Sequence, residues 1–120
     1  MENRILIRHP KNWGLDKALT ENLAKKILID FGFKSGVELS ILFVGQKRAK
    51  KLNQDYRQKS YVPQVLGFPM SKTADSDGII RLGDVVICTK KLKYEAVFQK
   101  KTVEEVLREW LRHGIENLLK

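Results

Sequence analysis

The sequence of 120 residues predicts a single α/β or α+β domain built on a small mixed sheet. Short runs of branched apolar residues, typical of strands, alternate with longer segments whose apolar residues recur at helical spacing. No repeat, low-complexity tract or break in composition divides the chain. A chain of this length can bury a core without disulfides or metal, so residues 1–120 are expected to form one domain.

The first half of the chain predicts two strands and two helices in alternation. Arg4–Arg8 has the composition of a short strand, and Glu38–Val44 that of a buried strand. Between them, apolar residues recur at helical spacing over 15–27, and Gly32 is a suitable residue to end this helix. One face of a second helix follows over 49–56, and its other face is rich in lysine and arginine.

The second half predicts two strands and then helices. The strands are Val65–Phe68 and Val85–Cys88, separated by the polar segment Ser71–Gly78, which we expect to be mobile. The best-specified element is the last helix, because Thr102 and Glu105 have the spacing of a capping box. A broad apolar stripe follows, formed by Val103, Val106, Leu107, Trp110, Leu111, Gly114 and Leu118.

The charge balance points to a polyanionic partner. Lysine and arginine number 23 against 14 acidic residues, and a formal charge of +9 makes nucleic acid the first candidate. Two clusters stand out, one of Lys47, Arg48, Lys50, Lys51 and Lys59, the other of Lys90, Lys91, Lys93, Lys100 and Lys101. Either cluster alone is also compatible with a merely solvated surface.

A cytoplasmic location is expected. No apolar run reaches the ~18 residues that a membrane span needs, and the N-terminal residues lack the apolar core of a signal peptide. The single Cys88 cannot form an intramolecular disulfide, which agrees with a reducing compartment. Cys88 is expected to be a small buried apolar residue.

Two blocks resemble the bacterial YbeY family of metal-dependent rRNA maturation endoribonucleases. Residues 53–69 read NQDYRQKSYVPQVLGFP, and residues 81–88 read RLGDVVIC. The family usually carries N-x-x-Y-R-x-K-x-Y-x-x-x-V-L-S-F-P, then L-G-D-I-V-I-S, then a helix with H-G-x-L-H-L-x-G-Y-D-H. The resemblance implies a mixed sheet of about four strands packed with helices. It also implies rRNA of the small ribosomal subunit as substrate, and a ribosomal protein or an assembly GTPase as further partners.

The chain departs from the family pattern where the metal ligands are expected. The family's three histidines hold one divalent ion, zinc or nickel, which activates a water molecule. Here His113 matches the first histidine, Asn117 stands at the second position, and the third position would follow Lys120. A neutral amide is a poor ligand beside imidazole, so we expect no metal, or a weakly bound one, and little or no cleavage. Glu109 and Glu116 are weaker candidates for a substitute site with His113.

The resemblance assigns Arg57 and His113 to the catalytic site. Arg57 matches an arginine thought to bind substrate phosphate, and its planar guanidinium suits a phosphodiester oxygen. A structural ion pair of Arg57 with Asp55 or Asp84 is the alternative. Asp84 is expected to orient Arg57 or a histidine. The predicted RNA-binding residues are Lys47, Arg48, Lys50, Lys51, Arg57 and Lys59, with Tyr56 or Tyr61 available for base stacking.

Further departures affect the loop before the third strand. Val62-Pro63-Gln64 replaces the usual P-T-D, and Gly67 replaces a serine, which removes hydroxyl and carboxylate groups expected near the site. Three functions therefore remain open. The chain is an rRNA maturation nuclease, a non-catalytic RNA- or ribosome-binding assembly factor descended from one, or an interaction module for an acidic protein.

Overall fold

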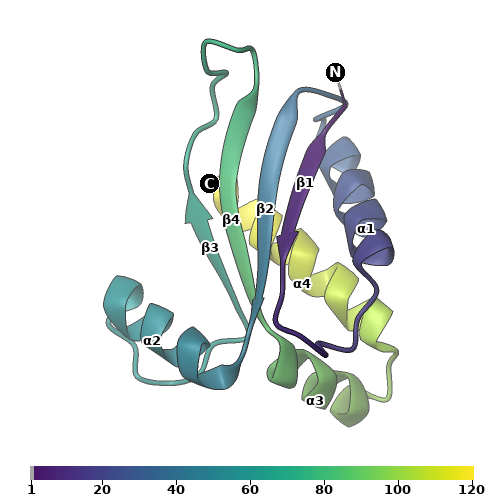
Figure 1. Cartoon of the computed structure of the whole chain (residues 1–120), viewed down its shortest axis with the longest axis vertical. Coiled ribbons are helices and arrows are strands. Elements are labelled where there is room, and N and C mark those ends of the chain that lie inside the picture. Colours follow the sequence, from purple (N-terminus) through teal and green to yellow (C-terminus); the bar gives the residue numbers. More distant parts are fainter. Residues whose placement is uncertain (1) are drawn as a thin grey trace.

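A computed structural model describes residues 2–120 (Figure 1). Strands and helices alternate in the first half, and two helices close the chain. The elements are β1 Arg4–Arg8, α1 Lys17–Asp30, β2 Val37–Val44, α2 Gln46–Arg57, β3 Val65–Pro69, β4 Ile80–Cys88, α3 Thr89–Gln99 and α4 Val103–Leu118. No helix within residues 2–120 has the length and apolar content that crossing a membrane would require.

The four strands form one mixed sheet in the order β1-β2-β4-β3. β1 and β4 both pair with β2 in parallel, and β3 pairs with β4 in the antiparallel direction. Parallel neighbours need a crossover connection, which α1 supplies between β1 and β2. The predicted α/β class with a mixed four-stranded sheet is confirmed.

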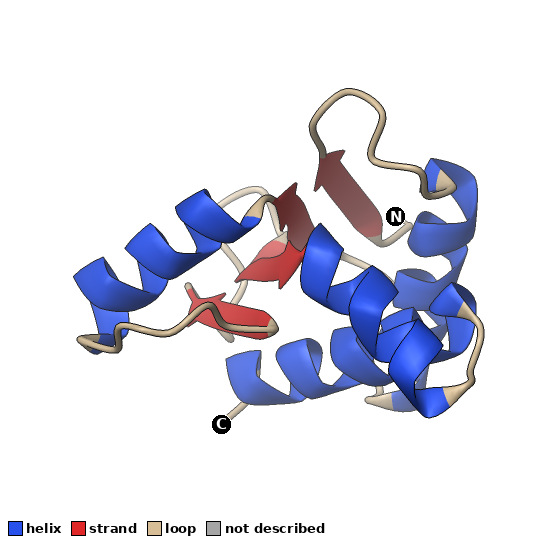
Figure 2. Ribbon diagram, turned by 90° about the horizontal axis from the view of Figure 1, so that it is seen from below, coloured by secondary structure: helices blue, strands red, loops and turns tan. Residues whose placement is uncertain are grey.

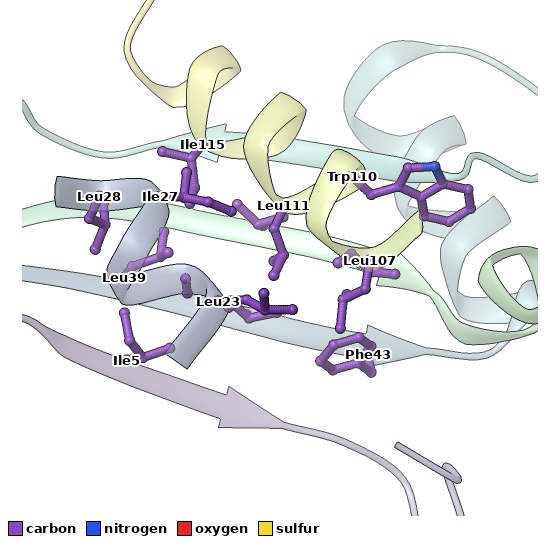
Figure 3. Packing of buried hydrophobic residues seen from close by; sticks show 14 of the residues in the cluster. Ile5, Leu23, Ile27, Leu28, Leu39, Phe43, Leu107, Trp110, Leu111 and Ile115 are labelled. Carbon is purple, nitrogen blue, oxygen red and sulfur yellow. The ribbon is translucent and has the colours of Figure 1, made fainter. Parts of the chain in front are cut away.

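Helices α1 and α4 pack on one face of the sheet and enclose the main core. Alternate residues of β2, such as Leu39, Ile41 and Phe43, point into this layer because successive strand side chains face opposite ways. Leu23 and Ile27 from α1 meet Leu107 and Leu111 from α4 there (Figure 3). The predicted apolar stripe of the last helix is buried except for Val103, which is half-buried, and the buried face also includes Ile115.

The start and the middle of α4 are both set by specific residues. Thr102 accepts from the Glu105 backbone N–H at 3.1 Å, and the Glu105 carboxylate accepts from the Thr102 N–H at 3.2 Å, which confirms the predicted capping box. Further along, a Cβ on Gly114 would lie 2.6 Å from a methyl carbon of Val85. Glycine at this position therefore lets α4 lie directly on the sheet.

Helix α2 covers the other face of the sheet, near the carboxyl end of β2 (Figure 2). It seals a small second cluster formed by Val44, Ala49, Leu66, Val86 and Cys88. Cys88 is buried and unpaired, as predicted. The two faces are thus unequal: α1 and α4 cover one, and α2 covers only part of the other.

Strand β4 begins earlier than predicted, at Ile80. Its pairing with β2 shifts by one residue, since Glu38 faces Arg81 and Leu39 faces Gly83. Gly83 has a φ of +131°, a conformation that favours glycine, and a Cβ there would collide with the carbonyl of Phe68. The L-G-D sequence is therefore a β-bulge inside the strand.

One arginine forms several ion pairs at the connection between β3 and β4. Arg81 forms ion pairs with Asp75 at 2.6 Å, Asp77 at 2.9 Å and Glu38 at 3.1 Å. The guanidinium of Arg81, together with the Ile79 N–H, lowers the pKa of Asp77 to about 2. Segment Ser71–Gly78, predicted to be polar and mobile, is thus tied to β4 through two carboxylates.

Candidate functional site

The end of α2 fixes the position of Arg57. The helix ends at Arg57 because Gln58 adopts a left-handed conformation with a φ of 55°. Asn53, one turn earlier, is fully buried and donates its side-chain N–H to the Tyr61 carbonyl at 3.0 Å. This contact holds the loop after α2 against the helix. The N-x-x-Y-R sequence thus anchors a loop and places an arginine at its base.

Arg57 lines a hollow in which three helices meet. Arg57 ends α2, Lys91 belongs to the first turn of α3, and His113 lies on α4. The hollow has a volume of about 390 Å³, and the loop before β3 forms its remaining wall. We call it the Arg57 hollow; it is lined by Arg57, Tyr61, Val62, Pro63, Gln64, Val65, Lys91 and His113.

The lining of the Arg57 hollow is positively charged and contains no acidic residue. Within residues 2–120, none of the ion pairs involves Arg57, Lys91 or His113. Asp55, the alternative partner for Arg57, pairs with Lys51 at 3.2 Å. Cationic groups that face a hollow without local counter-charges attract anions. A guanidinium can bind the oxygens of a phosphate through two parallel hydrogen bonds.

The residues around His113 do not supply a metal-binding set. Within residues 2–120, no three histidine, cysteine, aspartate or glutamate side chains gather in one place. Asn117 lies one turn beyond His113 on α4, and it offers an amide where the family usually has imidazole. Glu109, a candidate for a substitute ligand, is held by Lys101 at 2.7 Å. This donor set therefore does not fit the family's metal ion.

Two departures from the family pattern lie next to each other in space. Gly67 of β3 faces the second half of α4, and a Cβ at this position would lie 3.4 Å from the Cβ of Asn117. The positions of the family's serine and of its second histidine are thus in contact, and both residues are replaced in this chain. Val62, Pro63 and Gln64, a further departure, line the hollow that contains His113.

Asp84 does not lie beside His113. Val85 packs against α4 at Gly114, and successive strand residues face opposite sides, so Asp84 points to the face that α2 covers. There it lines a second hollow of about 240 Å³ with Tyr56 and Phe68. Tyr56 contacts Phe68 edge-on with ring centroids 5.2 Å apart. Of the two tyrosines predicted for stacking, only Tyr61 borders the Arg57 hollow.

The two predicted basic clusters lie on different parts of the surface. Lys47, Arg48, Lys50 and Lys51 are exposed along α2, and Lys59 is exposed in the loop that follows. In the second cluster, Lys91 alone lines the Arg57 hollow, whereas Lys90 and Lys93 line another hollow beside Lys11. Of the predicted RNA-binding residues, Arg57 alone lines the Arg57 hollow, and Lys91 joins it from the second cluster. The lining does not include Lys47, Arg48, Lys50, Lys51 or Lys59.

Comparison with known proteins shows to which family the chain belongs. A family model described as Endoribonuclease YbeY matches residues 9–119. The chain belongs to the YbeY family. Among its YbeY relatives, that of Mesoplasma florum is 32% identical over 107 residues, which cover 82% of this chain and 63% of the relative. That of Anaeromyxobacter sp. is 33% identical over 119 residues, 99% of this chain and 60% of the relative. Both carry the name Endoribonuclease YbeY.

The fold also agrees with a solved structure. The solution structure of TM1509 from Thermotoga maritima matches with a TM-score of 0.64 at 25% identity, covering 97% of this chain and 72% of that structure. The chain spans between 50% and 63% of the length of three curated YbeY relatives, the third being that of Thermodesulfovibrio yellowstonii.

Proposed function

We propose that this YbeY-family chain binds single-stranded rRNA at the Arg57 hollow, and that residues 2–120 alone give little or no metal-dependent cleavage. The observation that carries the proposal is the lining of the hollow: Arg57, Lys91 and His113 converge there and no carboxylate accompanies them. Arg57 and Lys91 are positively charged and favour an anion in this hollow. A phosphodiester fits this lining, because it accepts hydrogen bonds and neutralises the cations.

The surroundings of the hollow suit a single strand better than a duplex. Tyr61 lies at its border and is exposed, so its ring is available to stack on an unpaired base. The lysines of α2 extend the positive surface from the hollow along the helix. Small-subunit rRNA is the proposed target because the YbeY relationship implies it, and the ribosome is accordingly the proposed partner.

The proposed loss of cleavage follows from the donor set. An activated water molecule near neutral pH requires several strong ligands that hold the metal in a fixed, open geometry. His113 is one such ligand, and the neighbouring residues within 2–120 do not complete the set. Arg57 can still hold a phosphate without an activated nucleophile. Binding is therefore expected where cleavage is not.

Arg57→Ala is expected to weaken the binding of single-stranded RNA about ten- to hundredfold, the range for one hydrogen-bonded charge contact. Lys91→Ala should also weaken the binding of single-stranded RNA, because Lys91 lines the same hollow. Each substitution should also make the negative slope of log K against log salt shallower by about 0.7, since one fewer phosphate is neutralised. Both effects can be measured by fluorescence anisotropy with a labelled RNA of about ten nucleotides, a length typical of the sites that single-strand-binding domains cover.

Two variants control for charge and for geometry. Lys34→Ala removes one exposed positive charge before the amino end of β2 and should change affinity little. Arg57→Lys keeps the charge but loses the planar fork, so its affinity should lie between those of the parent and Arg57→Ala. The proposal fails if folded Arg57→Ala binds RNA as tightly as the parent.

A further inference from the structure

Helix α3 carries an exposed apolar face that the core does not explain. Its buried face consists of Thr89, Leu92 and Ala96. On the outer side, Tyr94 is 65%, Phe98 70% and Val97 80% exposed. An aromatic pair on a helix stabilises it by only about 0.2–0.5 kcal/mol, so helix stability is a weak reason to expose this surface.

The rings of Tyr94 and Phe98 form a nearly parallel pair on the surface of α3, which we call the platform. Tyr94 and Phe98 are one turn apart, and their rings are nearly parallel, with an angle of 13° and centroids 6.2 Å apart. Both rings therefore present flat faces in the same orientation. Flat, exposed aromatic faces of this kind accept the bases of single-stranded nucleic acids, because every base has a π-face to stack on them.

The charges around the platform favour an anionic partner, and single-stranded RNA also offers flat bases to the two rings. Lys90 and Lys93 precede Tyr94 on the outer side of α3, and neither forms an ion pair within residues 2–120. Both line the hollow that also contains Lys11. The only acid of α3, Glu95, accepts from Gln99 at 2.6 Å. Bases on the rings and phosphates on the lysines would match this pattern.

The platform is continuous with the Arg57 hollow. Lys91, Tyr94 and Phe98 follow i, i+3, i+7 spacing and so lie along one stripe of α3. Lys91 is the residue of this helix that lines the Arg57 hollow. At a rise of 1.5 Å per residue, Tyr94 lies about 5 Å beyond Lys91 along the helix axis, and Phe98 lies about 10 Å beyond Lys91. A strand that leaves the hollow past Lys91 therefore meets the two rings in turn.

We infer that Tyr94 and Phe98 are a base-stacking platform for single-stranded RNA, and that Lys90 and Lys93 hold the adjacent phosphates. The inference rests on the proposed function, since it extends the RNA path from the Arg57 hollow onto α3. It adds base stacking on α3 to the stacking proposed for Tyr61, whereas Arg57 contacts the backbone. It predicts that α3 adds affinity without adding strong sequence preference.

The test combines Tyr94→Ala with Phe98→Ala and compares two ligands. One is an oligouridine of about ten nucleotides, and the other is an abasic oligomer of the same length. The double variant should bind oligouridine at least about fivefold more weakly than the parent, as expected for losing one stacked base. Its affinity for the abasic oligomer should be unchanged. Tyr94→Trp with Phe98→Trp should retain the parent affinity, and Val97→Ser is the matched control on the same exposed face.

The outcomes separate this inference from the proposed function. If the double variant binds oligouridine like the parent while Arg57→Ala still weakens binding, the stacking platform is wrong and the hollow stands. If the parent does not bind RNA at all, both are wrong. If the double substitution instead turns a self-associated parent into a monomer without changing its RNA affinity, the face is a contact between copies of the chain, and the inference is overturned.

Discussion

Trp110→Ala is expected to lower the free energy of unfolding by about 3–5 kcal/mol, the usual cost of truncating a buried tryptophan. Trp110 is only 7% exposed and belongs to the main core between α4 and the sheet (Figure 3). Its removal leaves a cavity that the surrounding layer fills only in part. The effect is also functional, because α4 carries His113 to the Arg57 hollow. Denaturant unfolding, followed by circular dichroism, measures the loss.

Phe98→Ala is the matched control for this substitution. It removes an aromatic ring from a position that is 70% exposed, and it should change stability by no more than about 0.5 kcal/mol. Equal losses for the two variants would contradict the assigned core. So would a Trp110→Ala protein as stable as the parent.

Asn117→His is expected to raise the affinity for nickel or zinc by at least about 10–100-fold. Removing a residue that only supports a metal ligand already lowers metal affinity by this factor, and a direct ligand should contribute at least as much. His113 and residue 117 are one turn apart on α4, so two imidazoles there can share one ion. Gly67 faces position 117 and places no side chain against it. Isothermal titration calorimetry measures the change. Adding a third histidine through Lys120→Gly and an appended Tyr-Asp-His segment should tighten binding further.

The control keeps the introduced histidine at position 117 and removes His113. Asn117→His combined with His113→Ala again offers a single imidazole and should return to the weak affinity of the parent. The interpretation is wrong if the parent itself binds a stoichiometric metal ion and His113→Ala abolishes that binding. His113 would then have ligand partners other than Asn117, Glu109 and Glu116.

Local signals predicted the parts of the site that depend on local structure. The capping box at Thr102 and the stripe after it predicted the start of α4 and most of its buried face, because both arise from residues within a few turns. Arg57 is assigned to the site by family resemblance, and the structure explains its position through the buried Asn53 and the left-handed Gln58. These are short-range effects that a sequence pattern preserves.

Features that depend on packing could not be predicted in the same way. The side to which Asp84 points depends on which face α4 covers and on the bulge at Gly83, and neither is encoded locally. The sequence pattern gives no boundaries for α3 because the apolar residues of this helix lie on both sides, Leu92 inward and Tyr94 outward. That mixture hides the helical period. Outward aromatic residues one turn apart among lysines are the signal that would have drawn attention to its exposed face.

The most direct test of the loss of cleavage follows binding and cleavage of one single-stranded rRNA fragment by the same preparation. The fragment is incubated with the protein in a chelator and, separately, with added zinc or nickel. We expect the parent to bind the fragment under both conditions and to cleave it no faster than the RNA breaks down without protein. Arg57→Ala should bind the fragment about ten- to hundredfold more weakly than the parent. Metal-dependent cleavage by the parent that His113→Ala abolishes would contradict the proposed function.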